Sequence, residues 1–227
     1  MIKPNQLPKL LQLASPMLPV GGYSYSQGLE WAIESGAVIQ AEDVQLWVND
    51  VMELVLGRFE LPLLKRMALA CAARDTAALQ HWNALFLAAR DTAESRAETQ
   101  QMGYSLTRLL RDLQGESAPQ VRLLADLNPV SFPAAYACAV ALWNLPVKES
   151  LEAYGWSWIE NQVAVAMKTL PLGQVAGQKL MLALGAALPD WVERAWELTD
   201  DQLSNFAPLY SIAGCRHETQ YSRLFRS

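Results

Sequence analysis

The sequence is short of histidine and cysteine, two of the side chains that most often bind transition metals. Its 227 residues include two histidines and three cysteines. Only Cys215 and His217 lie close together along the chain, whereas a structural zinc site takes four such ligands. An ordinary cysteine beside a polar histidine is therefore favoured over a metal site within one chain, and a site shared between two copies stays open.

The cysteine count and the lengths of the apolar segments also restrict the setting of the protein. Three widely separated cysteines do not make a disulfide framework and favour a reducing compartment, so we expect a cytoplasmic protein. The longest apolar run, Ala134 to Trp143, is well short of the roughly 18 residues that a transmembrane helix needs, so we expect no membrane span. Prolines interrupt the N-terminal segment where a signal peptide requires a continuous apolar core, which predicts mature protein there.

Motifs that bind nucleotides or nucleic acids are missing as well. The glycines Gly21, Gly22 and Gly28 are followed by no lysine of a P-loop, and they lack the preceding strand that a dinucleotide fingerprint requires. A formal net charge of −5 disfavours nucleic acid as a partner. Basic residues gather only in the last twelve residues, whose three arginines and one glutamate give +2 and leave −7 on the other 215.

What the sequence does contain is helical periodicity along most of its length. Apolar residues recur at intervals of three and four, as in Val44, Val48, Val51 and Val55, and no alternation of period two is present. We therefore predict an all-α protein that forms a single globular domain of about ten helices over residues 1–227. Within it, residues 217–227, called the tail below, are predicted to bind a partner.

Capping residues predict where several helices begin. Asp75 and Ser131 are good N-caps, and Thr199 with Gln202 three residues later fits a capping box. The helix that Ser131 caps is apolar on all sides from Ala134 onward, so we place it at the centre of the core.

Prolines and glycines predict the breaks between helices. We expect Pro62 either to start a new helix or to kink the existing one, and Pro189 to open another helix. The segment around Pro119 is expected to be a connection, and the helix after the first loop is expected to begin at Tyr25 or Ser26.

One irregular segment, Ser15 to Glu30, interrupts the helices near the N-terminus and is called the opening segment below. Its two prolines forbid a helix, and the Gly21-Gly22 pair permits backbone angles that other residues resist. Tyr23 and Tyr25 follow as large amphipathic side chains. We expect a rigid binding element held between two helices, with Tyr23 as its main contact residue.

The tail has the composition of an interface anchor. If it is helical, Tyr221, Leu224 and Phe225 share one face beside Arg223 and Arg226. Aromatic residues that fill pockets and arginines that make directional hydrogen bonds are typical of binding hot spots. A tail that folds back on its own domain explains the pattern equally well.

Catalytic constellations receive little support. Ser24 or Ser26 could meet His217, with Glu30 or Glu218 as the orienting carboxylate, and a serine hydrolase is therefore our alternative hypothesis. With so many serines, however, such a pairing arises easily by chance.

The charged residues of the segment RDTAESRAE, residues 90–98, are expected at the surface. Glu94 and Glu98 share a helical face, which we interpret as solvated and not as the carboxylate pair of a glycosidase. Arg90 and Glu94 are expected to form an i,i+4 pair on that surface.

Four segments, in this order, resemble the UreF family of urease accessory proteins. They are LPVGGYSYSQGLEWA at residues 18–32, the patch with Arg90, Thr92, Glu94 and Arg96, the segment YGWSWIE with the Lys168 to Gln174 motif, and the terminal RHETQYSRLFRS. The resemblance runs from about Leu7 to Ser227, and it is weak in the region 110–145.

The resemblance implies an all-α protein that is not an enzyme and has no cofactor. Such a protein dimerises, binds the accessory protein UreD (also called UreH), and with it recruits the nickel-carrying GTPase UreG to the urease apoprotein, coupling GTP hydrolysis to nickel insertion. By position, Tyr23 and Arg223 match family residues associated with partner binding, and Cys215 and His217 are weak candidates for nickel transit. The full set of predicted partner-binding residues is Tyr23, Tyr25, Glu30, Arg216, His217, Glu218, Tyr221, Arg223, Leu224, Phe225 and Arg226.

Overall fold

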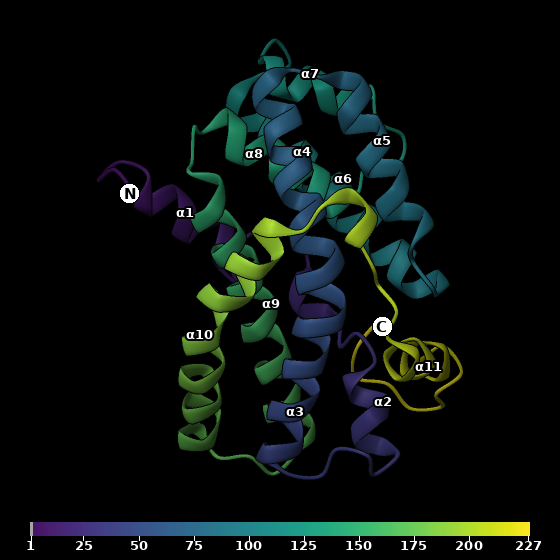
Figure 1. Ribbon diagram of the computed structural model, residues 1–227. Coiled ribbons are helices and arrows are strands. Elements are labelled where there is room, and N and C mark those ends of the chain that lie inside the picture. Colours follow the sequence, from purple (N-terminus) through teal and green to yellow (C-terminus); the bar gives the residue numbers. More distant parts are fainter. Residues whose placement is uncertain (1) are drawn as a thin grey trace.

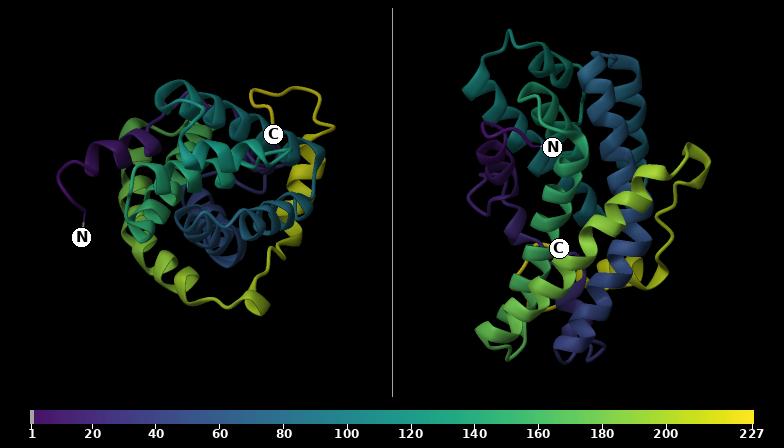
Figure 2. Two further views of the ribbon diagram at one scale, coloured as in Figure 1. Left: turned by 90° about the horizontal axis from the view of Figure 1, so that it is seen from above. Right: turned by 60° about the vertical axis from the view of Figure 1, so that its left-hand side comes forward.

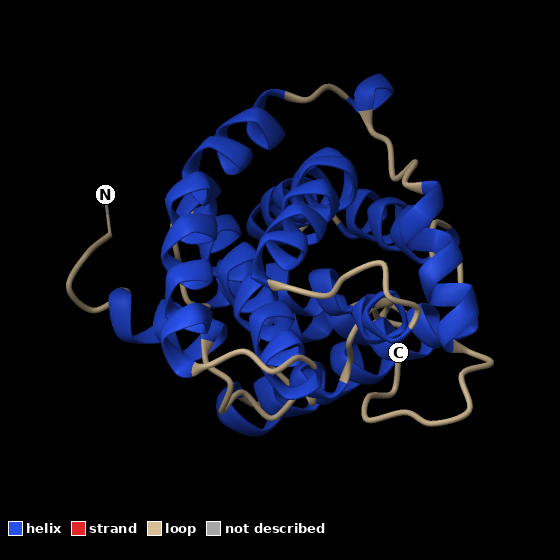
Figure 3. Cartoon of the chain, turned by 90° about the horizontal axis from the view of Figure 1, so that it is seen from below, coloured by secondary structure: helices blue, strands red, loops and turns tan. Residues whose placement is uncertain are grey.

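The computed structural model describes residues 2–227, and within them every regular element is a helix (Figures 1 and 3). The prediction of an all-α fold is confirmed. The α-helices are α1 (Leu7–Ala14), α2 (Leu29–Glu34), α3 (Ala41–Val51), α4 (Leu61–Ala73), α5 (Thr76–Ala88), α6 (Ala93–Gln114), α7 (Pro119–Ala125), α8 (Phe132–Leu142), α9 (Val147–Thr169), α10 (Gln174–Glu197) and α11 (Pro208–His217). The shorter elements are the 3₁₀ helices η1 (Gly22–Ser24) and η3 (Asp200–Gln202) and the π-helix η2 (Met52–Glu60).

Helix α8 lies at the centre of the core, as its sequence predicts. The Ser131 hydroxyl caps it by accepting the main-chain N–H of Ala134 at 3.3 Å, and every residue from Pro133 to Val140 is buried. Helices α4 and α6 both pack against α8. The approach of α6 depends on Gly103, because a Cβ at that position would lie 2.3 Å from the main-chain oxygen of Val130.

Helices α3 and α4 are joined through η2 into one long rod, so the interruption expected at Pro62 is a change of helix type and not a break (Figure 1). Proline has no N–H to donate to the carbonyl four residues earlier, that of Arg58. The wider turn of η2 precedes the proline, and the Arg58 carbonyl accepts the N–H of Ser204 at 3.2 Å instead.

Two further expectations based on proline are wrong. Helix α10 continues through Pro189, because its residues on both sides of the proline, among them Leu184, Leu188 and Val192, remain buried. Pro119 lies in the first turn of α7, where the missing N–H costs nothing, so a helix replaces the expected connection.

The segment after α10 crosses the outside of the molecule to reach α11 beside α2 (Figure 2, left). Side chains fasten it to the rod and to α5. Arg66 bonds to Asp200 at 2.7 Å and to the Leu198 carbonyl at 2.9 Å, and the Asn205 amide donates to the Ala89 carbonyl at 2.9 Å. The chain can therefore return to the neighbourhood of the opening segment, more than 180 residues after leaving it.

Candidate functional site

Two residues near the end of the opening segment have left-handed backbone angles. Gln27 has φ 53° and Gly28 has φ 84°, so α2 begins at Leu29. The expected start at Tyr25 or Ser26 is therefore wrong. Glycine also fits the contact between α2 and α11, because a Cβ on Gly28 would lie 3.1 Å from the Cβ of Ala213. The opening segment is thereby placed directly against the end of the chain.

The tail is irregular and runs back along the opening segment, so the helical arrangement considered for it is wrong. The Arg226 N–H donates to the Ser24 carbonyl at 2.8 Å. The main-chain oxygen of Ser227 accepts the N–H groups of Ser26 and Gln27 at 2.6 and 2.9 Å. Of the two alternatives for the tail, the one in which it folds back on its own domain is the one observed.

Glu30 holds the middle of the tail through a buried carboxylate. It accepts the main-chain N–H groups of Leu224 at 2.6 Å and Phe225 at 3.1 Å. Its Oε2 also lies 3.2 Å from Nε2 of His217. A buried carboxylate is stable only when hydrogen bonds or opposite charges satisfy it, and these three partners do so.

Glu94, in the first turn of α6, connects the same histidine to Arg223 further along the tail. Its Oε2 lies 2.8 Å from Nδ1 of His217, and its Oε1 lies 2.5 Å from an Arg223 nitrogen. Glu218 in turn accepts the main-chain N–H of Glu94 at 3.1 Å, at the helix N-terminus where a carboxylate is favoured. The opening segment, α6, α11 and the tail thus form one connected polar unit.

This arrangement does not leave His217 free to activate a serine nucleophile. Both ring nitrogens of His217 face carboxylates, and the ring is fully buried. The Ser26 hydroxyl donates to the main-chain oxygen of Ser227, while Ser24 is exposed. The pairing considered for a serine hydrolase is therefore not formed.

The aromatic and apolar residues of the tail point to different environments. Phe225 is buried, and the Lys168 ammonium lies 5.3 Å from its ring centroid. Tyr221 is fully exposed, and Leu224 keeps 72% of its surface exposed. The tail therefore combines one internal anchor with two exposed apolar side chains. Three exposed arginines accompany them, namely Arg216, Arg223 and Arg226.

The two tyrosines of the opening segment also contact the body of the protein. The Tyr23 hydroxyl donates to Glu160 of α9 at 2.7 Å, and burial together with this carboxylate raises the pKa of Tyr23. Tyr25 is buried and its carbonyl accepts the amide of Asn161 at 2.8 Å. Burial raises the pKa of Tyr25, and the nearby Arg226 opposes that rise.

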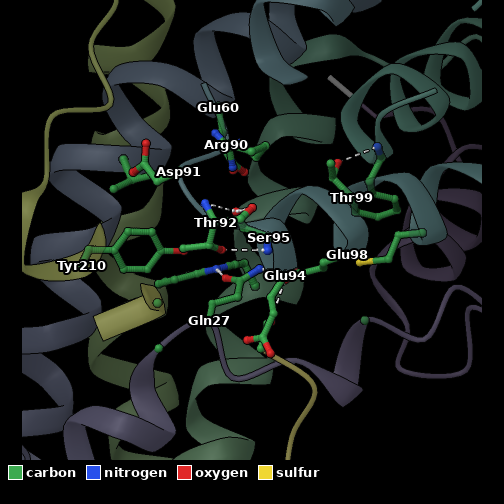
Figure 4. A pocket seen from close by; sticks show the side chains of 18 of the residues that line it. Gln27, Glu60, Arg90, Asp91, Thr92, Glu94, Ser95, Glu98, Thr99 and Tyr210 are labelled. Atoms are coloured by element: carbon green, nitrogen blue, oxygen red, sulfur yellow. Dashed lines mark hydrogen bonds and ion pairs between the residues drawn. The ribbon is translucent and has the colours of Figure 1, made fainter. Parts of the chain in front are cut away.

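A cavity of about 120 Å³ lies beneath this unit, between the opening segment, α6, α9 and α11 (Figure 4). On its wall Arg90 forms a largely buried ion pair with Glu60 at 2.8 Å, and its guanidinium carbon lies 4.1 Å from the centroid of the Phe86 ring. Tyr154 donates to the same Glu60 at 3.2 Å. The expected surface pair of Arg90 with Glu94 is wrong, because Arg90 precedes α6 and points inward.

Glu98 lies on the wall of this cavity and is buried, so the solvated face expected for Glu94 and Glu98 is also wrong. Its carboxylate accepts the Gln27 amide at 2.5 Å and the Ser227 hydroxyl at 2.9 Å. Burial raises the pKa of Glu98 to about 7, although the two hydrogen bonds oppose the rise. The charged composition of the segment RDTAESRAE is typical of an exposed surface. No local sequence pattern therefore predicted that Glu98 and Arg90 point inward.

The two candidates for nickel transit are not brought together within one chain. Cys215 is exposed and His217 is buried, because residues two apart on a helix point in different directions. Over residues 2–227, no group of three or more histidine, cysteine, aspartate or glutamate side chains is arranged to hold a metal ion. In the same part of the chain, no helix is both long and apolar enough to cross a membrane.

Comparisons with known proteins agree with the resemblance to the UreF family. A family model described as UreF matches residues 38–185. Two proteins called urease accessory protein UreF are 54% identical over all of both chains (Methylobacillus flagellatus) and 53% identical over 96% of this chain and 94% of the relative (Azoarcus sp.). A bifunctional urease accessory protein UreEF of Bordetella bronchiseptica is 48% identical over 98% of this chain and 52% of its own length.

These similarities show the class of the protein: the chain is one of the helical accessory proteins of urease maturation. Within that class it belongs to the UreF family.

Proposed function

We propose that this chain is a non-catalytic scaffold for nickel insertion into urease. With a UreD/UreH-type partner, it recruits the nickel-carrying GTPase UreG to the urease apoprotein and couples GTP hydrolysis to nickel delivery. Nickel is the cargo of this assembly and not a resident cofactor of the chain. Membership of the UreF family supports this role.

The observation that carries the proposal is the union of the opening segment with the tail. Glu30, His217 and Glu94 fix both segments to the body, so the exposed tail side chains are presented from a rigid base. A preorganised surface loses less conformational entropy when a partner binds. This is what a scaffold requires of its contact surface.

Within this surface the predicted residues divide into contacts and supports. We assign direct partner contact to the exposed Tyr221 and Leu224 and to the exposed arginines, with Arg223 serving both roles. The tail's net positive charge, against an acidic body, suits a partner with an acidic face. The supporting residues are Tyr23, Tyr25, Glu30, His217, Glu218 and Phe225.

Two further features complete the proposal. The chain acts as a homodimer in the cytoplasm, and nickel passes the Cys215 and His217 region only where two copies or a partner add ligands. The relative named UreEF supports close cooperation between accessory proteins, because there one chain carries a UreF-like part and a second accessory part.

The test is co-purification followed by activation. The chain lacking residues 221–227 should fail to capture the UreD-type partner and fail to support urease activation in a reconstituted system, while its helical circular dichroism remains. Retained capture by the truncated chain would refute the contact surface. Capture without activation by the intact chain would leave the surface in place and refute the coupling to nickel delivery.

A further inference from the structure

Two buried cysteines face one another across the centre of the fold, away from the site described above. Cys71 belongs to α4 and Cys138 to α8, the two helices that pack most closely in the core. Their sulfur atoms lie 2.7 Å apart, and both residues are fully buried. Nothing in the proposed scaffold role uses either thiol.

The distance between the sulfurs is close to that of a covalent bond. A disulfide has an S–S length of about 2.05 Å, so the two atoms need to approach by only about 0.7 Å. The residues around Cys138 on α8 are small and fully buried, among them Ala135, Ala137 and Ala139.

We propose that Cys71 and Cys138 are a buried dithiol that closes to a disulfide between α4 and α8 when the oxidant is a small peroxide. One thiolate attacks a peroxide oxygen and becomes a sulfenic acid as hydroxide leaves. The second thiolate then attacks the sulfenic sulfur, the S–S bond forms, and a second hydroxide leaves. With hydrogen peroxide, two thiols and one peroxide give one disulfide and two water molecules.

Burial controls which oxidants can act on the pair. Burial and the neighbouring Cys71 raise the pKa of the Cys138 thiol, so the reactive thiolate is scarce. Bulky disulfide reagents cannot reach either sulfur while the core is closed, whereas a peroxide is little larger than water. The exposed Cys215 has neither protection nor a partner, so its own oxidation would obscure that of the buried pair.

The experiment uses the full chain carrying Cys215→Ser, so that only the two buried cysteines remain. The protein is treated with hydrogen peroxide, quenched, unfolded and titrated for free thiols. We expect two thiols before treatment and none after it, with both restored by a reductant. Peptide mapping of the unreduced sample should give one species that joins the Cys71 and Cys138 peptides.

Variants of each partner separate the pair from independent oxidation. Adding Cys71→Ala or Cys138→Ala to the same background should abolish the linked species and leave the other thiol free at the peroxide dose that closes the pair. Peptide mapping of the Cys215→Ser protein itself does not depend on how well these core variants fold. Two thiols that survive treatment, or sulfinic acids without linkage, would overturn the proposal.

Discussion

His217 and Glu94 lie 2.8 Å apart, from Nδ1 to Oε2, and this contact joins the last helix to the first turn of α6. The other ring nitrogen faces Glu30 of α2 at 3.2 Å. One buried imidazole therefore connects three parts of the chain that are far apart in sequence. This connection also positions the tail, because the carboxylates of Glu30 and Glu94 both bond to residues further along it.

Replacing Glu30 by glutamine should release the tail. Two main-chain N–H groups bond to the two separate oxygens of Glu30, and a glutamine amide presents only one acceptor oxygen, so a buried donor loses its partner. We expect a loss of about 2 to 4 kcal/mol in the free energy of unfolding in urea. Amide hydrogen exchange at Leu224 and Phe225 should accelerate. Glu34→Gln, at an exposed position of the same helix, should change neither measurement.

Removing the Tyr221 side chain should weaken partner binding without affecting stability. The ring is fully exposed, so Tyr221→Ala should change the free energy of unfolding by less than about 0.5 kcal/mol. As an interface anchor, its loss should raise the Kd for the UreD-type partner at least about tenfold, measured by calorimetry. Tyr104→Ala, at an exposed tyrosine of α6, is the control. Equal effects of the two variants would contradict the assignment.

Glu98 should make the protein less stable as the pH rises. Its pKa is about 7 in the folded chain against 4.5 for an ordinary glutamate carboxyl, so the folded state binds the proton more tightly. The resulting stabilisation is fully present below pH 4.5 and is lost as the pH rises through 7, which amounts to about 3 kcal/mol.

The Glu98→Gln variant should lack this pH dependence. Urea unfolding at pH 5 and pH 8 should show the variant gaining on the parent protein by about 3 kcal/mol between the two pH values. Glu116→Gln, at an exposed carboxyl, should follow the parent at both. Parallel pH profiles for the Glu98→Gln variant and the parent would mean that Glu98 ionises normally.

Gly103→Ala should disrupt the packing of α6 on the entry to α8. The new methyl group would lie 2.3 Å from the Val130 oxygen and 2.8 Å from the Ser131 carbonyl carbon, both main-chain atoms that cannot rotate away. We expect a loss of about 3 kcal/mol or more in the free energy of unfolding. Gly173→Ala, where a Cβ meets nothing within 4 Å, should cost almost nothing in the same assay.

Breaking the buried ion pair should cost more than breaking an exposed one. Arg90→Met leaves Glu60 buried without its cation, for which we expect a loss of about 3 to 5 kcal/mol in urea unfolding. Adding Glu60→Gln should recover part of it. Arg58→Met, which breaks an exposed contact of 4.0 Å with Glu53, should cost below about 1 kcal/mol.

Local signals predicted the helices well and their long-range connections poorly. Asp75, Ser131 and Thr199 cap helices as expected, because a cap depends on residues three positions away. The effect of Pro62 depends on Ser204, whose main-chain N–H donates to the Arg58 carbonyl. No sequence pattern connects these two residues. Proline chemistry alone could therefore not distinguish a break from a change of helix type.

The candidate site shows the same division. The sequence pointed to the opening segment and the tail through their unusual composition, and the structure brings them into contact. The conformation of the tail follows from Glu30, nearly 200 positions earlier, so helical periodicity within the tail was misleading. The inward turn of Glu98 is likewise set by Gln27 and Ser227, which no local pattern connects to it.

The π-helix η2 lets one continuous rod serve two different neighbourhoods. Before it, α3 packs against α9 and α10; after it, α4 keeps contact with both of these helices and adds α5 and α8. Wider turns change the angular phase of the residues that follow, so the apolar stripe of α4 points in a direction that a uniform α-helix would not give it. The length of η2 therefore sets the rotation of α4 relative to α3, and a one-residue deletion there would turn the buried face of α4 by about 100°.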